Sequence, residues 1–206
     1  MKKLVMLLVT SLVTLSLFAQ TGLRHITFMG IPLDGEMSLF HSQLIKKGLR
    51  YDEYIGTKYA GKRFYNGTFA GEKAQIIVEY DERTDIVYQA TVAIDSNEDR
   101  LTIGKYAIMV NAIERKYCIE VDLDSIEGLK KRGVTVLGQK YTGQLDDWEY
   151  TRFSLQDVDS LDMIGTISVN LMPSSNKRDN QNYILLIQYV DSQNNRKQRE
   201  SNIDDL

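Results

Sequence analysis

Residues 73–94, KAQIIVEYDERTDIVYQATVAI, contain two runs in which apolar and polar side chains alternate, separated by the polar turn Asp81–Thr84. Alternation with a period of two is typical of a β-strand with one buried face. Two such strands joined by a short polar turn predict an antiparallel β-hairpin. The predicted buried faces are Ala74, Ile76, Val78 and Tyr80 in the first strand, and Ile86, Tyr88, Ala90, Val92 and Ile94 in the second.

The segment that precedes this hairpin carries the signals of an amphipathic helix. Met37, Phe40 and Leu44 follow one another at helical spacing and form one apolar stripe. Asp34 is placed to cap the free backbone N–H groups of the first turn, and Gly48 favours the end of a helix. The sequence therefore predicts a helix between Asp34 and Gly48.

A second helix is predicted over 99–117, where apolar and aromatic side chains keep helical spacing. They are Ile103, Tyr106, Val110, Ile113 and Tyr117. The strand over 183–190 is apolar on both faces, which is typical of a central strand. The other predicted elements are a helix over 125–132 and strands over 23–29, 62–70, 134–141, 148–155 and 164–171.

These elements predict an α+β fold, with a mainly antiparallel sheet and two principal helices packed on one face. The pattern G-x-K-Y-x-G occurs at 56–61 and again at 138–143. This echo leaves open whether the domain consists of two related helix-plus-sheet halves, over about 21–97 and 98–191.

The first twenty residues have the composition of a signal peptide. Two lysines precede an apolar run from Leu4 to Phe18, which is shorter than the about 20 apolar residues that a membrane-spanning helix needs. We expect residues 1–20 to be removed on export to the periplasm or the cell surface. A single domain over 21–191, without a transmembrane segment, and a polar C-terminal tail over 192–206 without regular structure would remain.

Charge and cysteine content restrict the possible partners. The 206-residue chain has 25 basic and 28 acidic residues and a net charge of −3, which loss of the two N-terminal lysines would bring to −5. An acidic chain without a basic block is a poor ligand for nucleic acid. The single cysteine, Cys118, excludes an internal disulfide. Because no cysteine stands at the end of the N-terminal apolar run, we do not expect a lipoprotein.

Three segments form a distinctive combination, namely HITFMGIPLDG at 25–35, GTFAG at 67–71 and IDDL at 203–206. In this combination the chain resembles uncharacterised secreted proteins of Bacteroides-type bacteria, which read F-x-G-I-P-[IL]-D-G, G-x-F-A-G and I-D-D-L. At Tyr117–Cys118 it departs from the Tyr-Gly-x-Pro of those proteins. The resemblance implies export and an α+β fold, and it assigns no activity.

The chain is rich in tyrosine, with 12 residues, and has one tryptophan. Aromatic side chains on an exposed strand can stack on sugars or anchor a protein partner. The alternative is that they pack half-buried within the sheet. The candidate binding residues are Tyr59, Tyr65, Tyr141, Trp148 and Tyr150.

No motif for catalysis, metal binding or a cofactor is present. His25 and His41 are the only histidines, and no nucleophile motif accompanies them. The acidic clusters do not match a calcium-binding loop, and we interpret them as solvated turns. We therefore name no catalytic residue, no metal ligand and no cofactor. Ser125 and Ser160 lie in D-[ST]-[apolar] tripeptides, which resemble the O-glycan acceptor of exported proteins in these bacteria.

The expected function is that of a non-enzymatic binding module for an envelope protein or a glycan. The order of a capped helix followed by strands is similar to the repeats of β-lactamase-inhibitor-like and outer-membrane-assembly lipoprotein domains, which are binding modules. Two alternatives stay open, a hydrolase that uses carboxylates and a structural component of the envelope. The sequence does not indicate an oligomeric state.

Overall fold

A computed structural model of the chain describes residues 24–95, 99–118, 126–145, 148–173 and 183–203. Over these residues the protein is α+β, with a mainly antiparallel sheet, as the hairpin pattern predicted. The predicted signal peptide and the candidate Ser125 lie outside the described residues.

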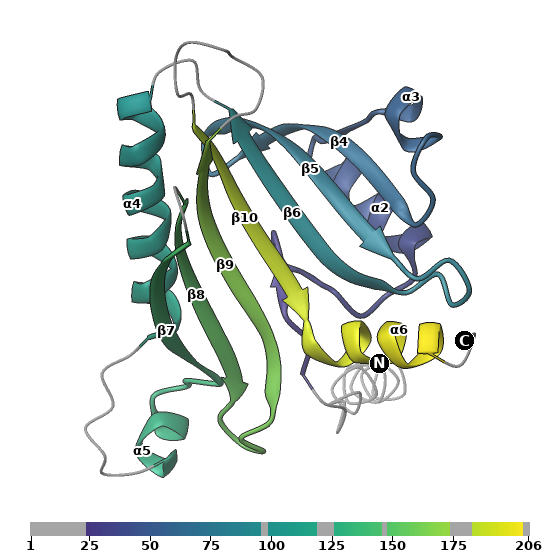
Figure 1. Ribbon diagram of the computed structural model, residues 1–206. Coiled ribbons are helices and arrows are strands. Elements are labelled where there is room, and N and C mark those ends of the chain that lie inside the picture. Colours follow the sequence, from purple (N-terminus) through teal and green to yellow (C-terminus); the bar gives the residue numbers. More distant parts are fainter. Residues whose placement is uncertain (1–23, 96–98, 119–125, 146–147, 174–182, 204–206) are drawn as a thin grey trace, which may run out of the picture.

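One sheet of eight strands forms the centre of the fold, in the order β3-β4-β5-β6-β10-β9-β8-β7 (Figure 1). Every neighbouring pair is antiparallel. β10 lies in the middle of the sheet, as its apolar faces predicted. The strands are β3 (Arg50–Tyr51), β4 (Lys62–Phe69), β5 (Glu72–Tyr80), β6 (Val87–Asp95), β7 (Val136–Leu145), β8 (Trp148–Asp157), β9 (Met163–Pro173) and β10 (Tyr183–Asp191).

The remaining elements precede, connect or follow these strands. A small hairpin of β1 (Thr27–Phe28) and β2 (Ile31–Pro32) replaces the single strand expected over 23–29. The helices are α2 (Met37–Lys46), α3 (Glu53–Gly56), α4 (Asp99–Tyr117), α5 (Ile126–Lys131) and α6 (Ser192–Ile203). None of the helices in the described part of the chain is both long enough and apolar enough to cross a membrane.

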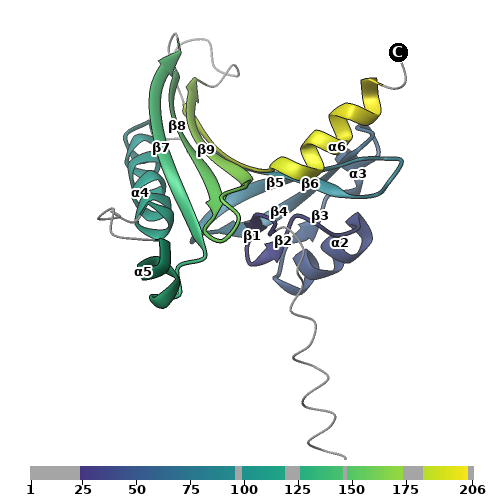
Figure 2. The same ribbon diagram turned by 90° about the horizontal axis from the view of Figure 1, so that it is seen from below.

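The hydrophobic core lies on the sheet face that carries Ile76 and Val92, which we call the outer face. Phe40 of α2 and Val110 and Ile113 of α4 belong to the same buried cluster as these strand residues. Full burial of such a side chain contributes about 1.5–3 kcal/mol, so the alternation in β5 and β6 decides which face is covered. Figure 2 shows α4 outside one arm of the bent sheet and α2 beneath the other.

Two predictions about the helices need correction. α2 begins at Met37 without a side-chain cap, because Glu36 pairs with Ile86 and the backbone N–H of Met37 donates to Asp85. Asp34 is therefore not its N-cap. Ile103 is exposed rather than part of the buried stripe of α4.

The hairpin also departs from strict alternation. A register shift at Glu79/Tyr80 places Val87, rather than Tyr88, on the buried face at the start of β6. A bulge of this kind adds one residue to one strand and reverses the facing of the residues beyond it.

The polar C-terminal tail was predicted to lack regular structure, and this prediction is wrong, because residues 192–203 form α6. The Asp191 carboxylate accepts the backbone N–H groups of Gln193 and Asn194 and thereby caps the helix. The Asn194 side chain in turn donates to the carbonyls of Leu33 and Val87. A polar helix is thus held to the fold by hydrogen bonds rather than by an apolar stripe.

The G-x-K-Y-x-G echo does not mark equivalent places in the fold. Residues 56–61 form the end of α3 and the turn before β4, whereas residues 138–143 lie inside β7. Two related halves are not confirmed.

Candidate functional site

The sheet face opposite the core, which we call the inner face, is the concave side of the bent sheet in Figure 2. A row of successive cross-strand partners runs across it, consisting of Tyr141, Arg152, Ser168, Gln188 and Thr91. Directly opposite residues of an antiparallel pair lie on the same face. The sheet therefore brings side chains from five strands together in one line.

A hollow of about 580 Å³ lies on this face over β7, β8, β9 and β10. The described side chains that line this inner hollow are aromatic, amide, hydroxyl or guanidinium groups. They are Tyr141, Tyr150, Arg152, Ser154, Ser168, Asn170 and Gln188. Such groups offer ring faces for stacking and many hydrogen-bond donors and acceptors.

Tyr150 is positioned by a glycine on the neighbouring edge strand. Gly143 is its cross-strand partner in β7, and a Cβ atom at that position would lie 2.5 Å from Cζ and 2.7 Å from Cε1 of the tyrosine. Only glycine leaves room for the ring to lean across β7. The ring thus lies along the sheet surface, at the rim of the inner hollow.

Tyr141 stands beside it with 52% of its surface exposed. Its hydroxyl donates to Oε1 of Gln139 at 2.7 Å, which orients the ring from the same strand. Of the four candidate aromatic residues whose side chains are described, Tyr141 and Tyr150 are the two that line the inner hollow.

Tyr59 lies elsewhere, near the opposite edge of the sheet. Its ring centroid is 5.4 Å from that of Phe64, which pairs with Ile77 of β5 and so points to the inner face. Tyr59 is 53% exposed but does not line the inner hollow. It therefore marks a separate aromatic position.

Tyr65 does not fit the prediction of an exposed binding residue. It is fully buried on the outer face beside Ile76, and its hydroxyl lies 2.9 Å from Nδ1 of His41. Burial raises the pKa of the Tyr65 hydroxyl well above its usual range. Two aromatic residues, Phe64 and Tyr65, follow each other in β4 and point to opposite faces of the sheet. The sequence alone did not indicate which of the two faces the core.

Two further candidates remain, Trp148 for aromatic binding and Ser160 for O-glycosylation. Trp148 is the first residue of β8, and its side chain lies outside the described part of the structure. Ser160 is exposed in the turn after β8, where its backbone N–H donates to Asp157 Oδ1 at 3.0 Å. Its hydroxyl is thus on the surface, and its glycosylation stays a prediction.

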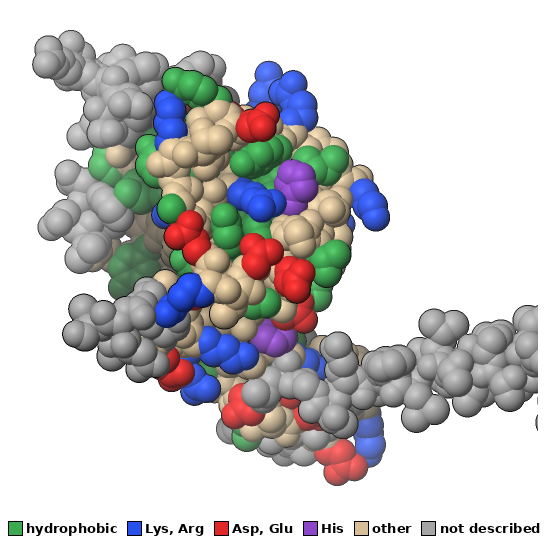
Figure 3. Space-filling view, turned by 90° about the vertical axis from the view of Figure 1, so that its right-hand side faces the viewer, with side chains coloured by type: hydrophobic (Ala, Val, Ile, Leu, Met, Phe, Trp, Pro, Cys, Tyr) green, Lys and Arg blue, Asp and Glu red, His purple; other side chains and the backbone are tan. Residues whose placement is uncertain are grey.

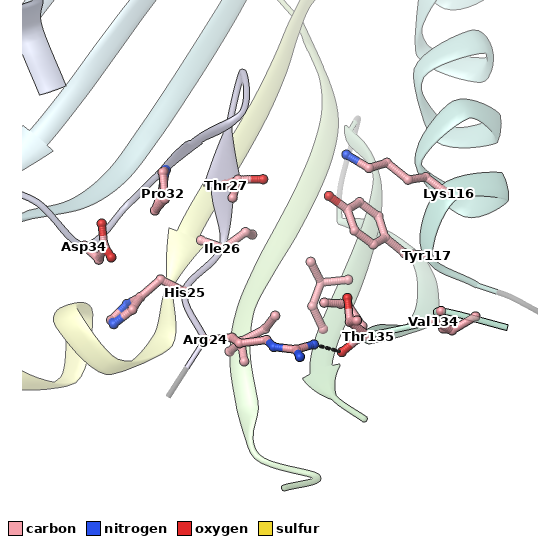
Figure 4. A pocket seen from close by; sticks show the side chains of 14 residues that line it. Arg24, His25, Ile26, Thr27, Pro32, Asp34, Lys116, Tyr117, Val134 and Thr135 are labelled. Atoms are coloured by element: carbon pink, nitrogen blue, oxygen red, sulfur yellow. Dashed lines mark hydrogen bonds between the residues drawn. The ribbon is translucent and has the colours of Figure 1, made fainter. Parts of the chain in front are cut away.

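A second hollow, of about 700 Å³, lies between the N-terminal segment and the C-terminal end of α4 (Figure 4). Tyr117 approaches it from α4, while Arg24 and Ile26 approach it from the N-terminal segment. The Arg24 guanidinium donates to the carbonyl of Thr135 at 3.0 Å and forms an ion pair with Asp157 at 3.1 Å. These contacts tie the first described residues to the segment before β7 and to the end of β8, which is a structural role.

Both histidines reach the surface on one side of the molecule (Figure 3). Nδ1 of His25 lies 2.9 Å from the buried carboxylate of Asp191, and this hydrogen bond raises the pKa of the imidazole despite its partial burial. Asp191 also accepts the backbone N–H of Ile26 and caps α6. The pair therefore joins the N-terminal segment to the C-terminal helix. Burial, with Arg63 nearby, lowers the pKa of His41.

The acidic turns have structural partners. The Asp81 carboxylate accepts the backbone N–H groups of Arg83 and Thr84, and Asp157 accepts that of Asp159. Burial opposes ionisation of Asp81, but these hydrogen bonds outweigh it and lower its pKa. Within the described ranges, no group of three or more histidine, cysteine or acidic side chains could hold a metal ion.

The described residues define the molecule as an α+β protein whose antiparallel sheet has a hollow on its concave face. No family model matches the chain, and neither a curated protein nor a solved structure is significantly similar to it.

Proposed function

We propose that this protein is an exported, non-enzymatic binding module that takes a glycan on the inner face of its sheet. The observation that carries the proposal is the lining of the inner hollow, which combines two tyrosines with amide and hydroxyl side chains. A sugar presents apolar C–H faces, which stack on aromatic rings, and hydroxyls, which pair with amides and hydroxyls.

A protein segment fits this lining less well than a sugar does. The fully buried core of a protein interface is more apolar than the rest of the surface, although tyrosine and arginine are enriched there. In the inner hollow the centre would contain Asn170, Gln188 and Arg152, each of which must find a partner once water is removed. A polyhydroxylated chain can supply such partners along its whole length.

Hydrolysis receives no support from this site. A glycosidase uses two carboxyl groups about 5–10 Å apart, on either side of the scissile bond. Among the described residues, none of the seven side chains that line the inner hollow is acidic. We therefore propose binding without cleavage.

We infer that α2 and α4 are the two principal helices and that both support the sheet from its outer face. Thr151 of β8 points to that face, and its hydroxyl lies 2.9 Å from the hydroxyl of Tyr106 in α4. On the next strand, Lys140 forms an ion pair with Glu114 of the same helix at 2.7 Å. Such support would hold the strands beneath the inner hollow without covering it.

Export rests on the composition of residues 1–20, and the resemblance to secreted proteins of Bacteroides-type bacteria agrees with it. We propose that the mature chain acts in the periplasm or at the cell surface. Amino-terminal sequencing of the chain recovered from cell fractions tests this, and a cytosolic chain that begins at Met1 would contradict it.

The binding proposal is tested with an array of immobilised neutral, uronic-acid and sulfated oligosaccharides, followed by titration of the bound sugars. Tyr150→Ala should weaken binding roughly fivefold, the equivalent of about 1 kcal/mol of aromatic contact. The matched control is Tyr54→Ala, because Tyr54 is 74% exposed and does not line the inner hollow. Absence of any bound glycan, together with capture of a protein or an envelope defect on deletion, would overturn the proposal.

A further inference from the structure

We propose that the glycan is acidic and that Arg152 binds its carboxylate or sulfate group. This inference rests on the proposed function and adds the chemical class of the ligand. It starts from a charge pattern on the inner face rather than from the shape of the hollow.

Arg152 is the only charged side chain among the described residues of β7, β8, β9 and β10 that point to the inner face. The other described side chains of these strands on this face are apolar, hydroxyl or amide groups, among them Tyr141, Tyr150, Ser168 and Gln188. A single cation among neutral groups is not explained by packing.

The Arg152 guanidinium has no carboxylate partner among the described residues, and its side chain is exposed. The nearest groups in the row are Tyr141 on one side and Ser168 on the other. Neither neutralises a positive charge. A guanidinium carries five N–H donors in a planar fork, which matches the two oxygens of a carboxylate or sulfate group.

The spacing between Arg152 and Tyr150 suits one sugar residue. Two positions along a strand separate them, so their Cα atoms are about 7 Å apart on the same face. A pyranose ring that stacks on Tyr150 can therefore extend the acidic group on its rim toward Arg152. Asn170, opposite Tyr150 in β9, is then available for the ring hydroxyls.

The charge of the whole chain makes this interaction selective. The chain has a net charge of −3, or −5 without the two N-terminal lysines, so an acidic polymer is repelled at long range and not attracted non-specifically. Affinity for such a polymer must come from a local contact. Because Arg152 is exposed, we expect added salt to weaken that contact.

The experiment compares one acidic oligosaccharide found on the array with its own methyl ester, titrated into wild-type protein and into Arg152→Gln. We expect the ester to bind about tenfold more weakly than the acid in the wild type, and equally in the variant. Arg115→Gln, on α4, is the matched control and should retain the preference. If a sulfated sugar is the one bound, its desulfated form takes the place of the ester.

The outcomes separate the two proposals. Binding of neutral glycans only, or equal binding of acid and ester to the wild type, overturns the acidic ligand and leaves the glycan-binding proposal standing. An array on which no glycan is bound overturns both. A preference for the acid that survives in Arg152→Gln assigns the anion to another residue and also overturns the inference.

Discussion

The contact between Gly143 and Tyr150 makes a prediction that separates binding from folding. In Gly143→Ala, the new methyl group would lie 2.5 Å from Cζ of the Tyr150 ring, so the ring must move off β7. The obstructing atoms are the outer end of a half-buried tyrosine side chain that can turn away from β7, so we expect the cost to folding to be small. Alanine in a strand gains about 0.5–1 kcal/mol over glycine. We therefore expect the free energy of unfolding to change by less than about 1 kcal/mol.

Glycan binding should respond more strongly than stability. Displacement of the ring removes the aromatic surface from the rim of the inner hollow. We expect the dissociation constant for the glycan to rise roughly fivefold. Urea unfolding followed by circular dichroism measures the first quantity, and titration calorimetry with an array-identified oligosaccharide measures the second. Gly35→Ala is the matched control, because its new methyl group would meet no atom within 4 Å.

A double-mutant cycle with Tyr150→Ala tests the reasoning itself. Once the ring is absent, Gly143→Ala should have no further effect on binding and should show only the gain in strand propensity. If Gly143→Ala weakens binding as much in the Tyr150→Ala background as in the wild type, the proposed contact is not the cause.

Three further predictions concern stability. Gly104→Ala in α4 places a methyl group in open space and should stabilise the protein by about 1 kcal/mol, read as a higher melting temperature; an unchanged or lower value would contradict the helix assignment. The His25–Asp191 pair raises the pKa of His25, so its contribution is complete below about pH 6.5 and is lost as pH rises through the raised pKa. The difference in melting temperature between wild type and His25→Gln should therefore shrink from about pH 6 to about pH 9, and a constant difference would exclude the pair as its source. Asn194→Ala leaves two buried carbonyls without their donor and should cost about 1–3 kcal/mol in urea unfolding, whereas Asn195→Ala should cost less than about 0.5 kcal/mol; equal losses would mean that α6 is not anchored through Asn194.

The errors in the sequence-based predictions have a common cause. Asp34 has the chemistry of an N-cap, but a bridge between Glu36 and Ile86 fixes the start of α2 two residues later. The C-terminal tail has no apolar stripe, and α6 is held instead by Asn194, whose side chain donates to the distant carbonyls of Leu33 and Val87. In each case a partner distant in sequence decided the structure of a local segment.

The candidate site shows the same limit. Tyrosine content pointed to aromatic binding residues, and Tyr141 and Tyr150 do meet in the inner hollow. Tyr65 was indistinguishable from them in the sequence, yet it lies buried under α2 on the other face. Arg152 was not singled out at all, because an isolated arginine in a strand carries no motif.

The sequence by itself determined the α+β class, the strands of the central hairpin, the bounds of α4 and the central place of β10, because these follow from periodicity within one segment. The tertiary structure decided which face stays open and which side chains share it. Strand register and the placement of helices depend on partners far apart in the chain, and a shift of one residue moves every side chain of a strand to the opposite face.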